Sequence, residues 1–192
     1  MIDRQKRQKD LSGRSRQFFA AASVQYFIKM ENLKKIIEVL NDLIKINKDR
    51  EAGYAKASRE LTPAEHNLRS AFERKAEESR NNIIQLEHKV EEIRERLGGQ
   101  PQTENATTEN PGFNGRIYKM WKEVKEFFSG NDSSSVIKSC VEGEVKAKKC
   151  YEDALNEYQL PEDISNLLLE QKTSLDASQQ EMSNYLERGT ND

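Results

Sequence analysis

The segment VIKSCVEGEVKAKKCYEDALNEY, residues 136–158, decides the fold class of this chain. At 100° per residue its apolar residues return to one face, which predicts a long amphipathic helix. Glu144 falls in the middle of that face, whereas Glu142 points the opposite way. A carboxylate in such a place is either buried with a partner or takes part in chemistry. The apolar face consists of Ile137, Cys140, Val141, Ala147, Tyr151, Leu155 and Tyr158.

The composition of the whole chain favours long helices. Charged residues make up 33% and hydrophobic residues 35%, and only four prolines interrupt the 192 residues. The apolar residues recur with the period of a helix, which distinguishes the chain from a disordered one of equal polarity. The formal net charge is −2, with acids and bases interleaved, so no nucleic-acid partner is predicted.

The predicted helices form two hairpins joined by a long crossover. Thr62-Pro63-Ala64-Glu65 is a capping box that starts the second helix, and Pro161 opens the fourth after a tight turn. The crossover contains a polar loop at 99–113 and a short amphipathic helix at 115–128 around Trp121. This order predicts an all-α, ferritin-like up-down four-helix bundle. The four long helices are expected at 32–60, 63–97, 136–158 and 161–186.

Polar residues interrupt the apolar faces of all four helices. Glu51 and Glu144 take comparable places, each on the first helix of a hairpin, as glutamates do in di-metal carboxylate bundles. Such a centre also needs a Glu-x-x-His on each of the other two helices, and neither His66 nor His88 completes one. The other polar positions in the predicted core are Asn47, Lys75, Ser79, Gln171 and Ser178.

Three interpretations of Glu51 and Glu144 follow. They are structural acids paired with core partners such as Lys75, or a weak two-carboxylate site for iron or another divalent metal, or a catalytic acid pair. The first is favoured, because polar layers often fix the register of helices without binding anything. No cofactor is expected, and the chain contains no P-loop, GxGxxG, GxSxG or HExxH motif that would predict a reaction.

The two cysteines are expected to be small structural residues. Cys140 and Cys150 lie ten residues apart on one predicted helix, which separates them by about 15 Å along its axis. That separation is too large for a disulfide between them. A reducing compartment, the cytoplasm, is therefore the predicted location.

Residues 1–29 precede the predicted bundle of 30–188, and residues 189–192 are expected to fray. Six basic residues occur within 4–16, and the mostly apolar run FFAAASVQYFIKM follows at 18–30. This order imitates a signal peptide, but no cleavage site follows the run. The run is also too short to span a membrane. Two interpretations stay open: an extension upstream of a natural start at Met30, or an arm that packs on a partner subunit.

Four stretches resemble a bacterial ferritin-like four-helix-bundle family of unknown function. They are LNDLIKINKDREAGYAKA (40–57), RERLGGQP (94–101), RIYKMWKEVKEFFSGND (116–132) and EGEVKAKKCYEDALNE (142–157). The resemblance covers roughly residues 32–187. It implies a ferritin-like fold, self-association and a cytoplasmic role that is related to stress. It implies no established reaction, although the wider superfamily suggests iron chemistry with Glu51 and Glu144 as the matching acids.

Two functions are therefore expected from the sequence. The favoured one is a non-enzymatic bundle that acts through self-association or partner binding, with the apolar run at 18–30 and the helix around Trp121 as its surfaces. The alternative is a metal-binding or oxidase-like bundle with a reduced carboxylate site at Glu51 and Glu144. The first predicts a homo-oligomer without a membrane span.

Overall fold

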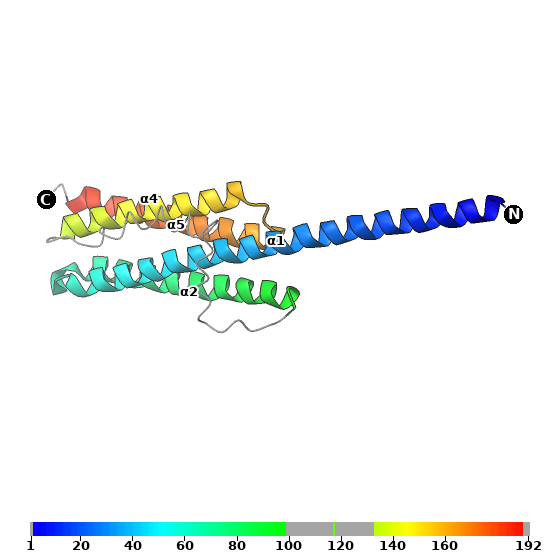
Figure 1. Ribbon diagram of the computed structural model, residues 1–192. Coiled ribbons are helices and arrows are strands. Elements are labelled where there is room, and N and C mark those ends of the chain that lie inside the picture. The colour runs from blue at the N-terminus through cyan, green and yellow to red at the C-terminus, as the bar shows by residue number, and fades with distance from the viewer. Residues whose placement is uncertain (1, 99–116, 118–132, 190–192) are drawn as a thin grey trace. The chain divides into compact units, whose positions relative to one another are not determined.

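The computed structural model describes residues 2–98, 117 and 133–189, and for residues 2–22 it describes the backbone alone. Within these ranges the long elements are α-helices and no strand occurs, which confirms the all-α prediction. The predicted loop at 99–113 and the predicted helix at 115–128 lie outside the described residues, except for Ile117. The elements are α1 (Ile2–Glu60), η1 (Pro63–Glu65), α2 (His66–Arg96), α4 (Ser133–Glu157) and α5 (Glu162–Gly189) (Figure 1).

The first helix, α1, begins at Ile2, far before the predicted start at Asn32. The prediction differs because it required a core-facing apolar stripe, whereas a helix needs only favourable propensity and no breaker. Residues 2–31 contain no proline and a single glycine, Gly13. The chain divides into two compact units, Met1–Lys35 and Ile36–Asp192, and α1 contributes to both. That residues 1–29 do not belong to the native chain stays a prediction.

The second unit contains the rest of α1 with α2, α4 and α5, and we call it the bundle. Its helices form two hairpins, α1 with α2 and α4 with α5 (Figure 1). Ion pairs join neighbouring helices at the surface, because long charged side chains on adjacent helices reach each other. They include Arg80–Glu51 between α2 and α1, Lys89–Asp163 between α2 and α5, and Lys148–Asp176 between α4 and α5.

The turn between α1 and α2 follows the predicted capping box. The backbone nitrogen and the hydroxyl of Thr62 donate to Glu65 Oε2 at 2.9 and 2.7 Å. Ser133, the first residue of α4, also donates its hydroxyl to Glu65. The hydrogen bonds from Ser133 and Thr62 lower the pKa of Glu65. At the far end of α2, Gly98 adopts a φ of 106°, which suits glycine at a helix end.

The core consists of two apolar layers with a polar layer between them. One layer, near the α1–α2 turn, includes Tyr54, Leu61, Phe72, Ile137 and Met182, and the rings of Tyr54 and Phe72 lie 5.7 Å apart. The other layer contains Leu40, Leu43, Leu86, Ile93, Ile164 and Leu168, all of them buried. Polar side chains are buried in the core as well, among them Asn47, Arg50 and Glu144.

Candidate functional site

The centre of the polar layer is a charged pair, Arg50 of α1 and Glu144 of α4. Each residue is 1% exposed. Arg50 Nη2 lies 2.8 Å from Oε1 and 3.1 Å from Oε2 of Glu144, so one guanidinium nitrogen faces both carboxylate oxygens. Arg50 Nη1 also donates to Asn47 Oδ1 at 3.1 Å. Ions that have lost their hydration need such close contacts, because otherwise the cost of burial exceeds their mutual attraction.

Tyr54, one turn after Arg50, donates its hydroxyl hydrogen to Glu144 Oε1. Burial raises the pKa of Tyr54 well above its ordinary value, and the charge of Glu144 raises it further. Burial, followed by the same charge, raises the pKa of the Cys140 thiol. Burial alone lowers the pKa of Arg50, but the neighbouring acids outweigh it and the pKa is raised. Tyr54 and Cys140 are therefore protonated at neutral pH, and Arg50 is charged.

A chain of side-chain hydrogen bonds extends the site through all four helices. Asn47 Nδ2 of α1 donates to the Tyr151 hydroxyl of α4 at 2.8 Å, and this hydroxyl donates to Gln171 Oε1 of α5 at 2.8 Å. Gln171 Nε2 donates to Gln85 Oε1 of α2 at 2.8 Å. Asn82 Nδ2 of α2 donates to Asn47 Oδ1 at 3.3 Å, so the network joins α2 to α1 as well as to α5. A polar network satisfied in this way fixes the relative register of the helices.

The network reaches a polar groove between α2 and α5. The groove has a volume of about 360 Å³, and buried amides of Asn82 and Gln171 form part of its lining. Three carboxylates and one guanidinium make the lining acidic. The complete lining is Arg74, Glu77, Glu78, Asn81, Asn82, Gln85, Glu170, Gln171 and Ser174.

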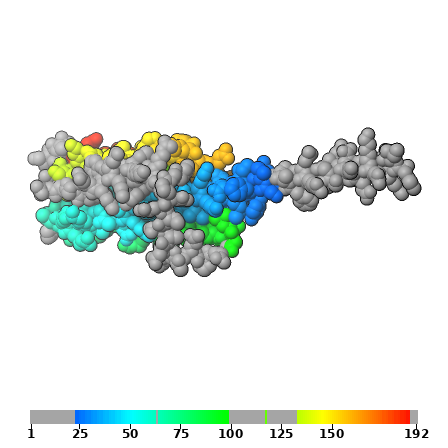
Figure 2. Space-filling view, in the orientation of Figure 1, coloured from blue at the N-terminus to red at the C-terminus, as the bar shows by residue number. Residues whose placement is uncertain are grey.

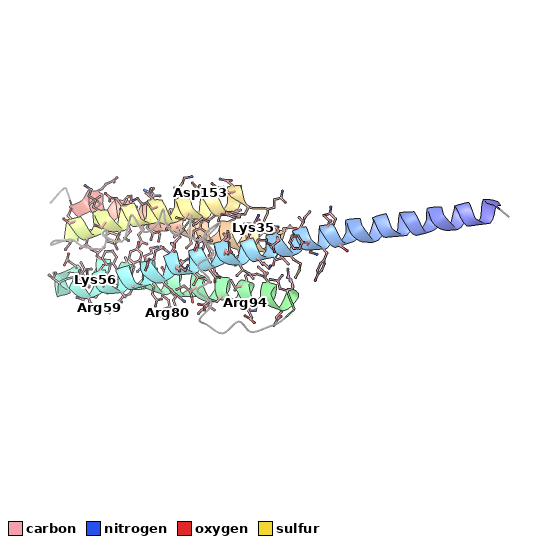
Figure 3. All side chains as sticks on the ribbon, viewed as in Figure 1. Lys35, Lys56, Arg59, Arg80, Arg94 and Asp153 are labelled. Carbon is pink, nitrogen blue, oxygen red and sulfur yellow. The ribbon has the colours of Figure 1, made fainter. Side chains whose placement is uncertain are left out.

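Glu51 and Glu144, the two acids predicted as metal ligands, have different surroundings. The Glu144 side chain is fully buried against Arg50, whereas that of Glu51 is 27% exposed. Glu51 Oε1 accepts hydrogen bonds from Arg80 Nε and Nη2 at 3.0 and 2.8 Å, and Figure 3 labels Arg80 on α2. Each acid thus has its own arginine. A metal site at Glu51 and Glu144 stays a prediction, and a bound ion would have to displace both guanidinium groups.

The five polar positions predicted in the core are all buried, namely Asn47, Lys75, Ser79, Gln171 and Ser178. Lys75 Nζ lies 3.1 Å from Glu181 Oε2 and 3.5 Å from Glu78 Oε2. The Ser79 hydroxyl donates to its own helix, at Lys75 O. The Ser178 hydroxyl has no hydrogen-bond partner among the described residues. Lys75 therefore pairs with Glu181 and with Glu78, which also lies 3.7 Å from Arg50 Nη2, and the predicted pairing of Lys75 with Glu51 or Glu144 is not among these contacts.

Arg50 is the central residue that the sequence predictions missed. A signal for it exists, because Leu43, Asn47, Arg50, Tyr54 and Ala57 follow each other at alternating spacings of four and three residues. This spacing is that of the inward seam of a packed helix. All five of these residues are buried. Arginine is rarely buried, and so its place on the seam is easily taken for the edge of a solvated face.

The other candidates for metal or thiol chemistry lie apart from one another. Among residues 2–98, 117 and 133–189, no group of three or more His, Cys, Asp or Glu side chains is placed to hold a metal ion. His66 is exposed, and His88 pairs with Glu92 at 3.2 Å on the surface. Cys140 and Cys150 are free buried thiols, and Cys150 Sγ donates to Ile117 O at 3.6 Å. No helix in these ranges is long and apolar enough to cross a membrane.

Comparison with known proteins gives a family without an assigned activity. Residues 35–157 match the family described as Domain of unknown function (DUF2383). None of the curated proteins matches the chain. The matched range begins at the boundary between the two units and contains Arg50, Tyr54 and Glu144. It excludes α5, which provides Gln171, and it excludes the first 34 residues of the chain.

Proposed function

Since the chain belongs to the family of domains of unknown function (DUF2383), whose name carries no activity, we propose its role from its own contacts. The protein acts by association through an exposed apolar segment of α1. The bundle is the folded domain that carries this segment and is not the site of a reaction. A ferritin-like arrangement of the two hairpins is part of this proposal. The long connection from α2 to α4 supports it, because ferritin-like bundles join their halves in this way.

The observation that carries the proposal is the surface of residues 23–30, SVQYFIKM, which we call the apolar segment. Val24, Tyr26, Phe27 and Ile28 are 57%, 64%, 65% and 56% exposed. In Figure 2 this part of α1 is the blue surface next to the grey atoms of the preceding residues. Val24, Phe27 and Ile28 stand at positions i, i+3 and i+4 of the helix, so they share one face and form a patch, whereas single exposed apolar residues are ordinary. Covering each of them would contribute roughly 1 kcal/mol to association. In a solution of the purified protein, only a second copy of the chain can bury these side chains.

The chemistry of the bundle centre supports association over catalysis. Both oxygens of Glu144 accept hydrogen bonds from Arg50, and Oε1 accepts another from Tyr54. The pKa values of Tyr54 and Cys140 are raised, so neither is an ionised nucleophile at neutral pH. A cytoplasmic location is part of the proposal, and the free thiols of Cys140 and Cys150 support it.

Light scattering of the full chain at micromolar concentration tests the association. We expect a mass above that of one chain, and a shift toward the monomer in the double variant Phe27→Ser/Ile28→Ser. The matched control is Ile84→Ser/Leu169→Ser, which removes two apolar side chains of similar exposure, 58% and 55%, from the bundle surface. A monodisperse monomer for the unaltered chain would overturn self-association through the apolar segment.

The metal-binding alternative, with iron or another divalent ion at Glu51 and Glu144, has its own test. Elemental analysis and Fe(II) titration of the purified chain measure uptake directly. We expect no stoichiometric metal, because arginine nitrogens already contact oxygens of each carboxylate. Uptake that disappears in Glu51→Gln/Glu144→Gln would favour the alternative and count against a purely structural bundle centre.

A further inference from the structure

The charge of the chain is divided unequally between its two units. Residues 1–35 contain nine basic and three acidic residues, a net charge of +6. Residues 36–192 contain 22 basic and 30 acidic residues, a net charge of −8. The overall charge of −2 therefore conceals a basic unit and an acidic one. Such asymmetry between parts of a chain is typical of proteins that bind an anionic surface through one part.

The basic residues of the first unit lie on both sides of its apolar residues along the sequence. Six of them occur within 4–16, and Lys29, Lys34 and Lys35 follow the apolar run. Suppose that two copies of the chain pair in parallel through this region alone. Their basic residues would then lie side by side, and the repulsion between like charges opposes such a dimer. The order of residues therefore favours a partner that is apolar and anionic at once.

We propose that the first unit, residues 2–35 of α1, binds the surface of an anionic lipid bilayer. This inference rests on the proposed function, because it names the partner of the same apolar segment. Val24, Phe27 and Ile28, which share one face of the helix, enter the boundary between headgroups and acyl chains, where aromatic and aliphatic side chains are stable. The basic residues that precede and follow the segment in the sequence supply positive charge that attracts lipid phosphates, and the stems of Lys and Arg are long enough to reach headgroups.

The length of the apolar run matches a helix that lies at the interface. The run 18–30 has 13 residues, about 20 Å as a helix, against about 30 Å for the hydrocarbon core of a bilayer. The bundle, with its net charge of −8, gains no electrostatic attraction from an anionic surface. Binding is thus expected to depend on the first unit and not on the larger one.

Flotation of the full chain with lipid vesicles tests the proposal. We expect it to float with vesicles of phosphatidylcholine and phosphatidylserine, and not with vesicles of phosphatidylcholine alone. Phe27→Ser/Ile28→Ser removes binding. Arg14→Gln/Arg16→Gln weakens it about fivefold for each charge, since each basic residue near an anionic surface contributes to that extent. The controls Ile84→Ser and Arg59→Gln, on the bundle surface, leave binding unchanged.

The outcomes separate this inference from the proposed function. Oligomers by light scattering without flotation overturn the membrane partner and leave association through the apolar segment intact. A monomer that does not float overturns both. Equal binding to both kinds of vesicle overturns the role of the basic residues. Retardation of DNA by the full chain, lost in Arg14→Gln/Arg16→Gln and unaccompanied by flotation, identifies nucleic acid as the anionic partner and also overturns the inference.

Discussion

Arg50 and Glu51 are neighbours on α1, yet their ion pairs differ in almost every respect. Arg50 points into the bundle and meets the fully buried Glu144 of α4. Glu51 points toward α2 and meets Arg80, whose side chain is 54% exposed. Successive residues of a helix are turned by about 100°, so the side chains of Arg50 and Glu51 face different surroundings. The pair of Arg50 is dehydrated, and the pair of Glu51 is hydrated. The same two chemical groups therefore have different consequences in the two places.

The difference lies in what happens when one partner is lost. Water replaces the missing partner of an exposed charge at little cost. A buried charge has no such replacement, and the free energy of unfolding then falls by the desolvation of the orphaned ion. The buried pair accordingly favours the register of α1 and α4 in which Arg50 Nη2 meets Glu144.

The largest loss of stability is expected for Glu144→Ala, which removes the acid of the buried pair. It removes the carboxylate to which Arg50 Nη2 and the hydroxyl of Tyr54 donate. We expect the free energy of unfolding to fall by about 3–5 kcal/mol, the usual cost of breaking a buried pair. Urea unfolding followed by circular dichroism measures it. That loss is a large fraction of the stability of an ordinary domain.

The control for that prediction replaces both ions, in Arg50→Met/Glu144→Leu. Apolar side chains of similar size remove the desolvation cost along with the attraction, so the double variant should be more stable than Glu144→Ala. If the double variant is instead less stable than the single one, the pair is not coupled in the way that its geometry indicates.

Removing one hydrogen bond gives a smaller effect. Tyr54→Phe keeps the ring against Phe72 and deletes the hydroxyl that donates to Glu144. A hydrogen bond to a charged group contributes about 1.5–3 kcal/mol, and we expect a loss in that range by urea unfolding. Tyr185→Phe is the control, because the Tyr185 hydroxyl donates at 3.4 Å to Asn67 O in an exposed position. An equal loss in both variants would contradict the special role of Tyr54.

Alkaline pH is expected to destabilise the bundle through its buried tyrosines and cysteines. The pKa values of Tyr54, Tyr151 and Cys140 are raised in the folded bundle, first of all by burial. Burial likewise raises the pKa of Cys150 to about 12. When a group has a higher pKa in the folded state than in the unfolded state, its full contribution to the free energy of unfolding is present below the unfolded-state pKa, about 8.5 for Cys and 10 for Tyr. That contribution is lost as the pH rises above this value. Each group should then contribute a fall of about 1.4 kcal/mol per pH unit.

Unfolding free energies measured by urea from neutral pH to about pH 10.5, across the ordinary pKa of Tyr, provide the check. Tyr54→Phe should flatten the alkaline slope by one proton, because the unfolded chain then has one phenol fewer to ionise. A stability that stays level across this range, or phenolate absorbance from every tyrosine at an ordinary pKa in the folded protein, would contradict the burial of these groups.

The sequence predicted most of the bundle because its helices carry independent signals. The capping box at Thr62, the turn before Pro161 and the apolar face around Glu144 each mark one element, and the structure has α2, α4 and α5 close to those places. The start of α1 was not predicted, because the sequence of residues 2–31 shows no apolar stripe of helical period. A helix without a core face leaves no periodic signal in the sequence.

The site was predicted only in part, for a reason that Arg50 and Glu51 make clear. Leu40, Ile44 and Glu51 share one face of a regular helix, so the sequence places Glu51 in the core, in a position symmetric with that of Glu144. The seam of Leu43, Asn47, Arg50 and Tyr54 is turned by one residue from that face. Hydrophobicity identifies the core face of a helix only to within such a step when an arginine occupies it.

The smallest expected effect belongs to Glu51→Gln. It removes the charge that faces Arg80, but water solvates both groups, so the urea midpoint should stay within error of the unaltered protein. Any residual coupling, measured by a double-mutant cycle with Arg80→Gln, should disappear at high salt, whereas the effect of Glu144→Ala should persist because buried charges are poorly screened. A destabilisation by Glu51→Gln that rivals Glu144→Ala would show that Glu51 has a dehydrated partner and would restore the symmetry of the two acids.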